Sequence, residues 1–125
     1  MTVRVMIVDD QAPFRTAARL VVESTDGFDV VGEAESGEES IGLAKEVDPD
    51  LVLMDVNLPG INGLEATRSI LDGAVHRVVI LLLSTYEESE FGPRISESGA
   101  AGFISKSAFE PDGLREAWER ATAPA

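Results

Sequence analysis

The segment VRVMIVDD, residues 3–10, decides the fold of this 125-residue chain. It is an apolar run, broken only by Arg4, that ends directly in two aspartates. Further short apolar runs follow at residues 28–32, 51–54, 78–83 and 102–104. These runs are continuous and do not alternate with polar residues, which is typical of strands covered on both faces. The pattern therefore predicts a parallel sheet.

Segments with helical spacing of apolar residues separate the runs. Their apolar positions are Phe14, Ala17, Ala18, Val21 and Val22; Ile41, Leu43, Ala44 and Val47; Leu64, Thr67, Ile70 and Leu71; and Leu114, Ala117, Trp118 and Ala121. A fivefold alternation of strand and helix with right-handed crossovers predicts a doubly wound α/β sandwich. For this length we expect a five-stranded parallel sheet of flavodoxin-like order, 2-1-3-4-5.

Local signals mark several element boundaries. Pro13 suits the start of the first helix, and Ser36 with Glu39 resembles a capping box that opens the second. Gly92 and Pro93 fall where the fourth helix should be, so we expect it to begin at Pro93 or to be short and mobile. We predict one domain over residues 1–121 and a tail, or the start of a linker, over residues 122–125.

Composition excludes several functional classes. The formal net charge is -13, with 23 acidic and 10 basic residues, which disfavours contact with nucleic acid or an anionic membrane. Cysteine is absent, and His76 is the only histidine, so thiolate, His-based metal and triad sites are excluded. The sequence shows neither a secretory signal nor an apolar run long enough to span a bilayer, and we expect a soluble cytoplasmic protein.

Polar side chains follow four of the predicted strands. They are Asp9 and Asp10, Asp55, Ser84 and Lys106. The predicted strand order would bring all five together at one edge of the sheet, where ligands collect in this class of fold. Each aspartate alone could be an ordinary loop residue. The ordered set indicates a site.

Three close carboxylates repel each other unless a cation is present. Oxygen ligands without His or Cys favour Mg²⁺, which takes one or two carboxylates, several waters and phosphoryl oxygens. Lys106 would add a second cation that pairs with Asp55 or with a phosphoryl oxygen. We therefore expect a magnesium site that handles phosphoryl groups.

The chain resembles the receiver domain of two-component response regulators over nearly its whole length. The motifs that carry the resemblance are VMIVDDQ, DLVLMDVNLPGINGLE, VVILLLSTY and GAAGFISKS. The segments FDVVGEAESGEE and GAAGFISK are most similar to the NarL/LuxR-type subfamily, whose members are usually DNA-binding transcription regulators.

The resemblance implies a role for each residue of the site. Asp55 would accept a phosphoryl group from the phosphohistidine of a sensor histidine kinase. Asp10 and Asp55 would ligate Mg²⁺, with the backbone carbonyl of Asn57 as a third ligand and Asp9 acting through water. The domain would be a phosphoacceptor with slow autodephosphorylation, not a turnover enzyme.

The resemblance also implies a conformational switch. Lys106 and Ser84 would each contact a phosphoryl oxygen, and the aromatic ring of Phe103 would rotate into the space that the Ser84 hydroxyl leaves. Phe103 could also be a core residue only. Ser107 stands where many relatives have proline, so a cis bond there is not dictated, and Thr85 is bulkier than the Ala or Gly often found after the switch hydroxyl.

Three interpretations of function stay open. The first is a receiver that controls transcription through a DNA-binding domain outside these residues and forms a homodimer on phosphorylation. The second is a stand-alone receiver that signals by protein contact. The third is a Mg²⁺-dependent aspartyl phosphohydrolase, although such enzymes usually have a carboxylate where Asn57 stands. We expect Arg15 and Arg19 to be solvated, with a contact to a kinase or partner receiver as an alternative, and Trp118 to pack against the core.

Overall fold

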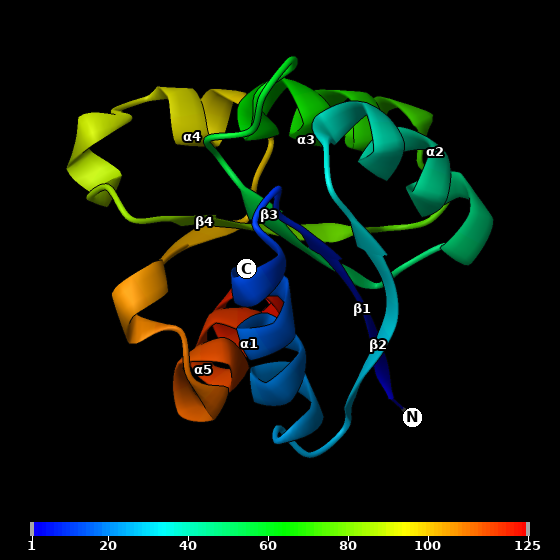
Figure 1. Ribbon diagram of the computed structural model, residues 1–125, viewed down its shortest axis with the longest axis vertical. Coiled ribbons are helices and arrows are strands. Elements are labelled where there is room, and N and C mark those ends of the chain that lie inside the picture. Colours follow the sequence, from blue (N-terminus) through cyan, green and yellow to red (C-terminus); the bar gives the residue numbers. More distant parts are fainter. Residues whose placement is uncertain (1, 125) are drawn as a thin grey trace.

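The computed structural model describes residues 2–124 and contains a five-stranded parallel sheet. The strand order is β2-β1-β3-β4-β5, which confirms the predicted order (Figure 1). The strands are β1 (Val3–Val8), β2 (Phe28–Ala34), β3 (Leu51–Asp55), β4 (Val79–Ser84) and β5 (Gly102–Ser105).

Most strands extend further toward the carboxyl edge than the apolar runs indicated. β2 runs to Ala34, which pairs with Val8, and β3 includes Asp55, which pairs with Leu83. Backbone pairing continues past the last apolar residue because the ladder depends on backbone N–H and C=O groups and not on side-chain polarity. The aspartates that the sequence predicts for the site therefore lie on or directly beside strand ends.

Helices cover both faces of the sheet. Helices α1 (Ala12–Glu23) and α5 (Pro111–Thr122) lie on one face, and α2 (Gly37–Val47), α3 (Gly63–Gly73) and α4 (Arg94–Glu97) lie on the other (Figure 1). Two short 3₁₀ segments, η1 (Glu88–Glu90) and η2 (Lys106–Ala108), follow β4 and β5. Within residues 2–124, no helix is long and apolar enough to cross a membrane.

The core consists of two apolar layers, one on each face of the sheet. Met6, Met54 and Leu82 belong to the layer under α2, α3 and α4. The alternate residues Ile7, Leu53, Leu81 and their neighbours belong to the layer under α1 and α5. Burial of both faces of β1, β3 and β4 explains why these strands are continuous apolar runs.

Helix starts agree with part of the sequence prediction. Pro13 lies in the first turn of α1, and the Ser36 hydroxyl accepts the Glu39 amide at 3.0 Å. The reciprocal half of that capping box is absent from the described residues. A complete capping box instead opens α3, where Asn62 and Glu65 each accept the other's backbone N–H.

Gly63 sets the distance between α3 and the end of β3. A Cβ atom at this position would lie 2.1 Å from the carbonyl oxygen of Asp55. The Gly63 amide donates to the Val56 carbonyl at 2.8 Å, so the backbones meet with no room for a side chain. This contact fixes the start of α3 beside the acidic edge.

The fourth helix is short, as the sequence predicted. It covers only Arg94–Glu97, with Pro93 at its N-cap, and Gly92 adopts a φ of 56°. The segment between β4 and α4 is held by Phe91, which is buried against the core. The division into a domain over residues 1–121 and a tail over 122–125 stays a prediction, and residues 1 and 125 lie outside the described residues.

Replacing Thr67 with valine is expected to stabilise the protein. Thr67 is fully buried on α3, and its hydroxyl has no hydrogen-bond partner within residues 2–124. Valine has a similar shape and removes an unsatisfied polar group, so we expect the free energy of unfolding in urea to rise by about 1 kcal/mol.

Thr25→Val is the matched control for this prediction. The Thr25 hydroxyl is also buried but donates to the Val21 carbonyl at 2.7 Å, so its loss should lower the free energy of unfolding by about 1 kcal/mol. Equal destabilisation by both substitutions would show that the Thr67 hydroxyl is satisfied in solution.

Candidate functional site

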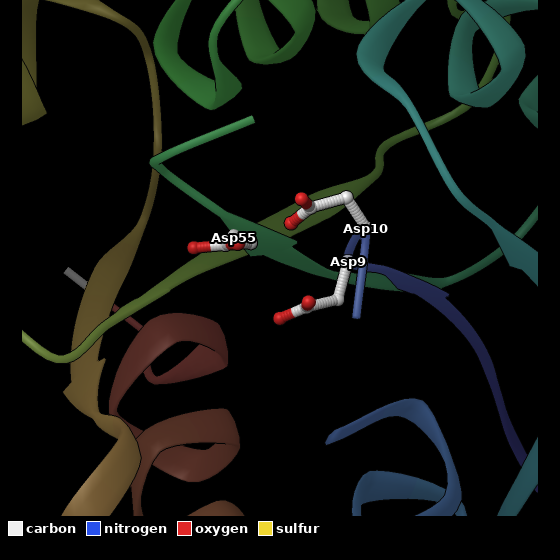
Figure 2. Close-up of side chains that lie close together, drawn as sticks. All are labelled: Asp9, Asp10 and Asp55. Carbon is white, nitrogen blue, oxygen red and sulfur yellow. The ribbon is translucent and has the colours of Figure 1, made fainter. Parts of the chain in front are cut away.

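The predicted polar residues meet at the carboxyl edge of the sheet. Asp9 and Asp10 follow β1, Asp55 ends β3, Ser84 ends β4, and Lys106 opens η2 directly after β5. Strands β1 and β3 are neighbours, so their terminal acids share one region, and Figure 2 shows the three aspartate side chains extending into it.

The three carboxylates form a compact oxygen cluster. One oxygen from each of Asp9, Asp10 and Asp55 lies within 4.8 Å of the others. Asp9 is 1% exposed and Asp55 is 4% exposed, whereas Asp10 is open to solvent. The cluster therefore has a buried base and one open side, through which a ligand could enter.

Lys106 is the cation of the site. Its Nζ lies 2.7 Å from Asp9 Oδ2 and 3.6 Å from Asp55 Oδ2, so its nearer partner is Asp9 and not Asp55. The ammonium also lies 4.3 Å from the ring centroid of Phe14, in cation–π geometry. These contacts hold the ammonium between the two buried carboxylates.

Asp55 resists ionisation in this environment. Burial, together with the negative charge of Asp9 and to a smaller degree Asp10, raises the pKa of Asp55 from 3.8 to about 6. The Lys106 ammonium and the Asn57 backbone N–H, which donates to Asp55 Oδ1 at 3.2 Å, oppose the shift without cancelling it. An added cation would therefore be favoured here.

Ser84 is buried and held by two donors. Its Oγ accepts the Tyr86 amide at 3.0 Å and the Asn57 side-chain amide at 3.3 Å. Because both lone pairs are occupied by these donors, the hydroxyl proton stays available for a third group. The Asn57 side chain thus connects the ends of β3 and β4.

Phe103 lies on the same face of the sheet as Ser84. It pairs with Leu82, two residues before Ser84, and is only partly buried against the core. Its ring lies 5.8 Å from that of Phe91, which also contacts Tyr86 edge-on at 6.5 Å. Phe103 is therefore part of an aromatic group that includes the segment before α4.

The prediction that Arg15 is solvated is wrong. Its side chain is only 12% exposed, and it donates from Nη1 to the Asp9 carbonyl at 2.7 Å and from Nη2 to Glu35 at 3.1 Å. Arg19 is 43% exposed and pairs with Glu33 and Glu23. Helical spacing alone could not show the contacts of Arg15, because Asp9 lies in the loop after β1 and Glu35 lies directly after β2.

Phe14 also escaped the sequence prediction as a residue near the site. Its place on the apolar stripe of α1 marked it as core, but nothing in the sequence placed Lys106 over its ring. Trp118 does pack as predicted, edge-on against Phe28 with ring centroids 6.1 Å apart. His76 lies exposed before β4, away from the site.

The donor set fits a hard divalent cation. All three converging ligand atoms are carboxylate oxygens, which Mg²⁺ prefers, and no more than two need bind it directly. Lys106 neutralises only part of the charge of three aspartates. Together the cluster and the ammonium form a site that is suited to a metal ion and a phosphoryl group.

A doubly wound parallel sheet with an acidic, oxygen-only site at its carboxyl edge defines the class of this protein. The family model of the response regulator receiver domain matches residues 5–119. The chain belongs to this family.

Curated relatives include response regulators of Pseudomonas and Escherichia species. Response regulator GacA of Pseudomonas viridiflava is 44% identical over 106 residues, which are 85% of this chain and 49% of that protein. Response regulator UvrY of Escherichia coli is 39% identical over 106 residues, 85% of this chain and 48% of that protein. The chain thus spans about half the length of these relatives.

Solved structures show the same fold. A LuxR-family two-component response regulator from Aurantimonas sp. superposes with a TM-score of 0.83 at 40% identity, over 95% of this chain and 84% of that one. The response regulator domain of Thermotoga maritima CheB gives a TM-score of 0.86 at 26% identity and covers all of both chains. The resemblance to NarL/LuxR-type receivers is therefore confirmed.

Proposed function

We propose that this domain accepts a phosphoryl group on Asp55 from the phosphohistidine of a sensor histidine kinase. The observation that carries the proposal is the geometry of the edge: a buried Asp55 carboxylate lies 3.6 Å from the Lys106 ammonium and within the acidic cluster. Membership of the receiver family supports the same reaction.

The transfer needs few groups. A carboxylate oxygen of Asp55 forms the new bond to phosphorus, the phosphorus–nitrogen bond of the phosphohistidine breaks, and its electron pair stays on the imidazole. Ionised Asp55 needs no general base. Lys106 would stabilise charge on a phosphoryl oxygen, and the free hydroxyl proton of Ser84 would be donated to another.

Several residues would hold Mg²⁺ for this reaction. Asp10 and Asp55 are the proposed direct ligands, with the backbone carbonyl of Asn57 as a third and Asp9 acting through a water. When bound, the ion supplies positive charge against the phosphoryl oxygens and relieves the repulsion among the carboxylates. Asn57 is held by two hydrogen bonds, since its backbone N–H donates to Asp55 Oδ1 and its side-chain amide donates to Ser84 Oγ, and this fixed position supports its place in the set.

We propose that phosphorylation changes the surface through Ser84 and Phe103 and favours a homodimer. Transcription would be the output, through a DNA-binding domain outside these residues. The match covers only about half of each longer relative, among them a transcriptional regulatory protein of Bacillus subtilis, which supports that output. A receiver that acts by protein contact alone is the alternative. The cytoplasmic location stays a prediction.

No observation favours a phosphohydrolase. The residue two positions after Asp55 is Asn57, whose side-chain amide donates to Ser84 and cannot act as a general acid or base. We therefore regard the domain as a phosphoacceptor and not as a turnover enzyme.

Incubation of the protein with acetyl phosphate and MgCl₂, followed by intact mass spectrometry, tests the proposed function. We expect a gain of one phosphoryl group per chain, which is lost when EDTA replaces MgCl₂ because the carboxylates then repel the incoming phosphate. A mass that does not change with Mg²⁺ present would overturn the proposal. Release of many equivalents of phosphate from a phosphomonoester would instead favour the hydrolase.

A further inference from the structure

Arg15 is the most deeply placed arginine side chain near the acidic site. It lies in the first half of α1 and is 12% exposed, whereas Arg19, one turn later on the same helix, is 43% exposed. Both arginines face the end of β2, where they share Glu33 as a partner. They differ in what else they contact.

Of these two arginines, only Arg15 has a hydrogen bond to the acidic site within the described residues. Its Nη1 donates to the backbone carbonyl of Asp9 at 2.7 Å. The Asp9 amide donates to the Ala34 carbonyl of β2 at 3.1 Å, so both backbone polar groups of Asp9 are held. The Asp9 carbonyl belongs to the peptide that joins Asp9 to Asp10. The orientation of this peptide fixes the direction in which the Asp10 carboxylate points.

The guanidinium is itself fixed by two carboxylates. Glu35 lies 3.1 Å from Nη2 and Glu33 lies 3.6 Å from Nε, so three acceptors on two segments orient one planar group. The two glutamates balance its positive charge. Its effect on the acidic site is therefore geometric more than electrostatic.

We propose that Arg15 is a positioning residue of the metal site, which it serves by holding the Asp9–Asp10 peptide so that both carboxylates stay directed toward Asp55. The inference rests on the proposed function, because it assumes that these carboxylates bind Mg²⁺. Groups that orient the ligands of a metal commonly change its affinity by 10- to 100-fold when they are removed, as a general order of magnitude.

Isothermal titration calorimetry with MgCl₂ at constant ionic strength tests the proposal. In Arg15→Met, which keeps a long apolar side chain but removes the donors, we expect the Kd for Mg²⁺ to rise about tenfold. Arg19→Met is the matched control, because it also loses the pairing with Glu33 but has no hydrogen bond to Asp9 within the described residues. Its Kd should stay within about twofold of the wild type.

The direction of the change separates positioning from two simpler roles. Removing a positive charge near the site would by itself strengthen cation binding, so a weaker affinity in Arg15→Met cannot be a charge effect. A purely structural clasp would lower the melting temperature of Arg15→Met and leave its Kd unchanged. Arg15→Lys keeps the charge and an ammonium donor group but loses the planar guanidinium, and we expect its Kd to lie between those of wild type and Arg15→Met.

Several outcomes would overturn the inference. These are an unchanged or lower Kd in Arg15→Met, an equal rise in Arg19→Met, or an Arg15→Lys variant as weak as Arg15→Met. If the wild-type protein itself shows no Mg²⁺ binding, the proposed function fails together with this inference. Binding by the wild type with no change in Arg15→Met overturns only the role of Arg15.

Discussion

Replacing Asp55 with asparagine is expected to abolish the gain of a phosphoryl group from acetyl phosphate. The asparagine side chain has nearly the same shape, but its amide is not a nucleophile toward phosphorus. The remaining acids are not equivalent acceptors, because Asp9 is held by Lys106 at 2.7 Å and by the Gln11 amide at 2.8 Å. We expect the labelling rate to fall by roughly a hundredfold or more, to the level of a reaction without protein.

Asp72→Asn is the control for this experiment. Asp72 lies exposed near the end of α3, and its replacement changes the net charge by the same amount. This variant should take up one phosphoryl group at the wild-type rate, as measured by intact mass over time. Labelling of Asp55→Asn at the wild-type rate, or loss of labelling in Asp72→Asn, would contradict the assignment of Asp55 as acceptor.

The same Asp55→Asn substitution is expected to stabilise the metal-free protein at neutral pH. The pKa of Asp55 is raised to about 6, mainly by burial, so ionising this residue costs more in the folded state than in the unfolded chain. A shift of this size corresponds to a cost of about 3 kcal/mol once the carboxyl is ionised in both states. Asparagine is never ionised and does not carry that cost.

The stabilisation should depend on pH in a defined direction. Between pH 4 and pH 6 the folded protein keeps the Asp55 proton that the unfolded chain releases, so the contribution of Asp55 to stability is present below pH 4 and is lost as pH rises through 6. We expect the variant to exceed the wild type by about 1 kcal/mol at pH 4.5 and by about 3 kcal/mol at pH 7.5.

Urea unfolding in EDTA at the two pH values measures this difference in the free energy of unfolding. At pH 7.5 the Asp55→Asn substitution should also raise the melting temperature by about 10 °C. The exposed Asp72→Asn variant should show less than about 0.5 kcal/mol at either pH. A stabilisation of Asp55→Asn that does not grow between pH 4.5 and pH 7.5 would show that the Asp55 carboxyl is not penalised by its surroundings.

Much of the fold could be predicted because its signals are local. The apolar runs that become β1, β3 and β4 are buried on both faces, so their composition directly reflects their place at the centre of the sheet. Gly92 and Pro93 interrupt the fourth helix for reasons of backbone geometry that act within a few residues. Strand ends were less well predicted, since β2 and β3 continue through polar residues that still pair through the backbone.

The meeting of Asp9, Asp10 and Asp55 could also be predicted, because strand order alone brings the ends of β1 and β3 together. Lys106 was placed correctly at the same edge, but its nearer partner is Asp9. Lys106 Nζ lies 2.7 Å from Asp9 and 3.6 Å from Asp55, and this preference depends on side-chain rotamers and on the ring of Phe14, which no spacing in the sequence reveals.

By itself, then, the sequence determined the order of the elements, the sheet and the edge at which the acids collect. These features follow from hydrophobic periodicity and from the order of strands and helices, which are both local properties of the sequence. Only the tertiary structure decided that the pKa of Asp55 is raised, that Asp9 is the nearer partner of Lys106, and that Arg15 donates a hydrogen bond to the Asp9 carbonyl. Those properties arise from burial and from charged neighbours that are distant in sequence, and both exist only once the layers have packed.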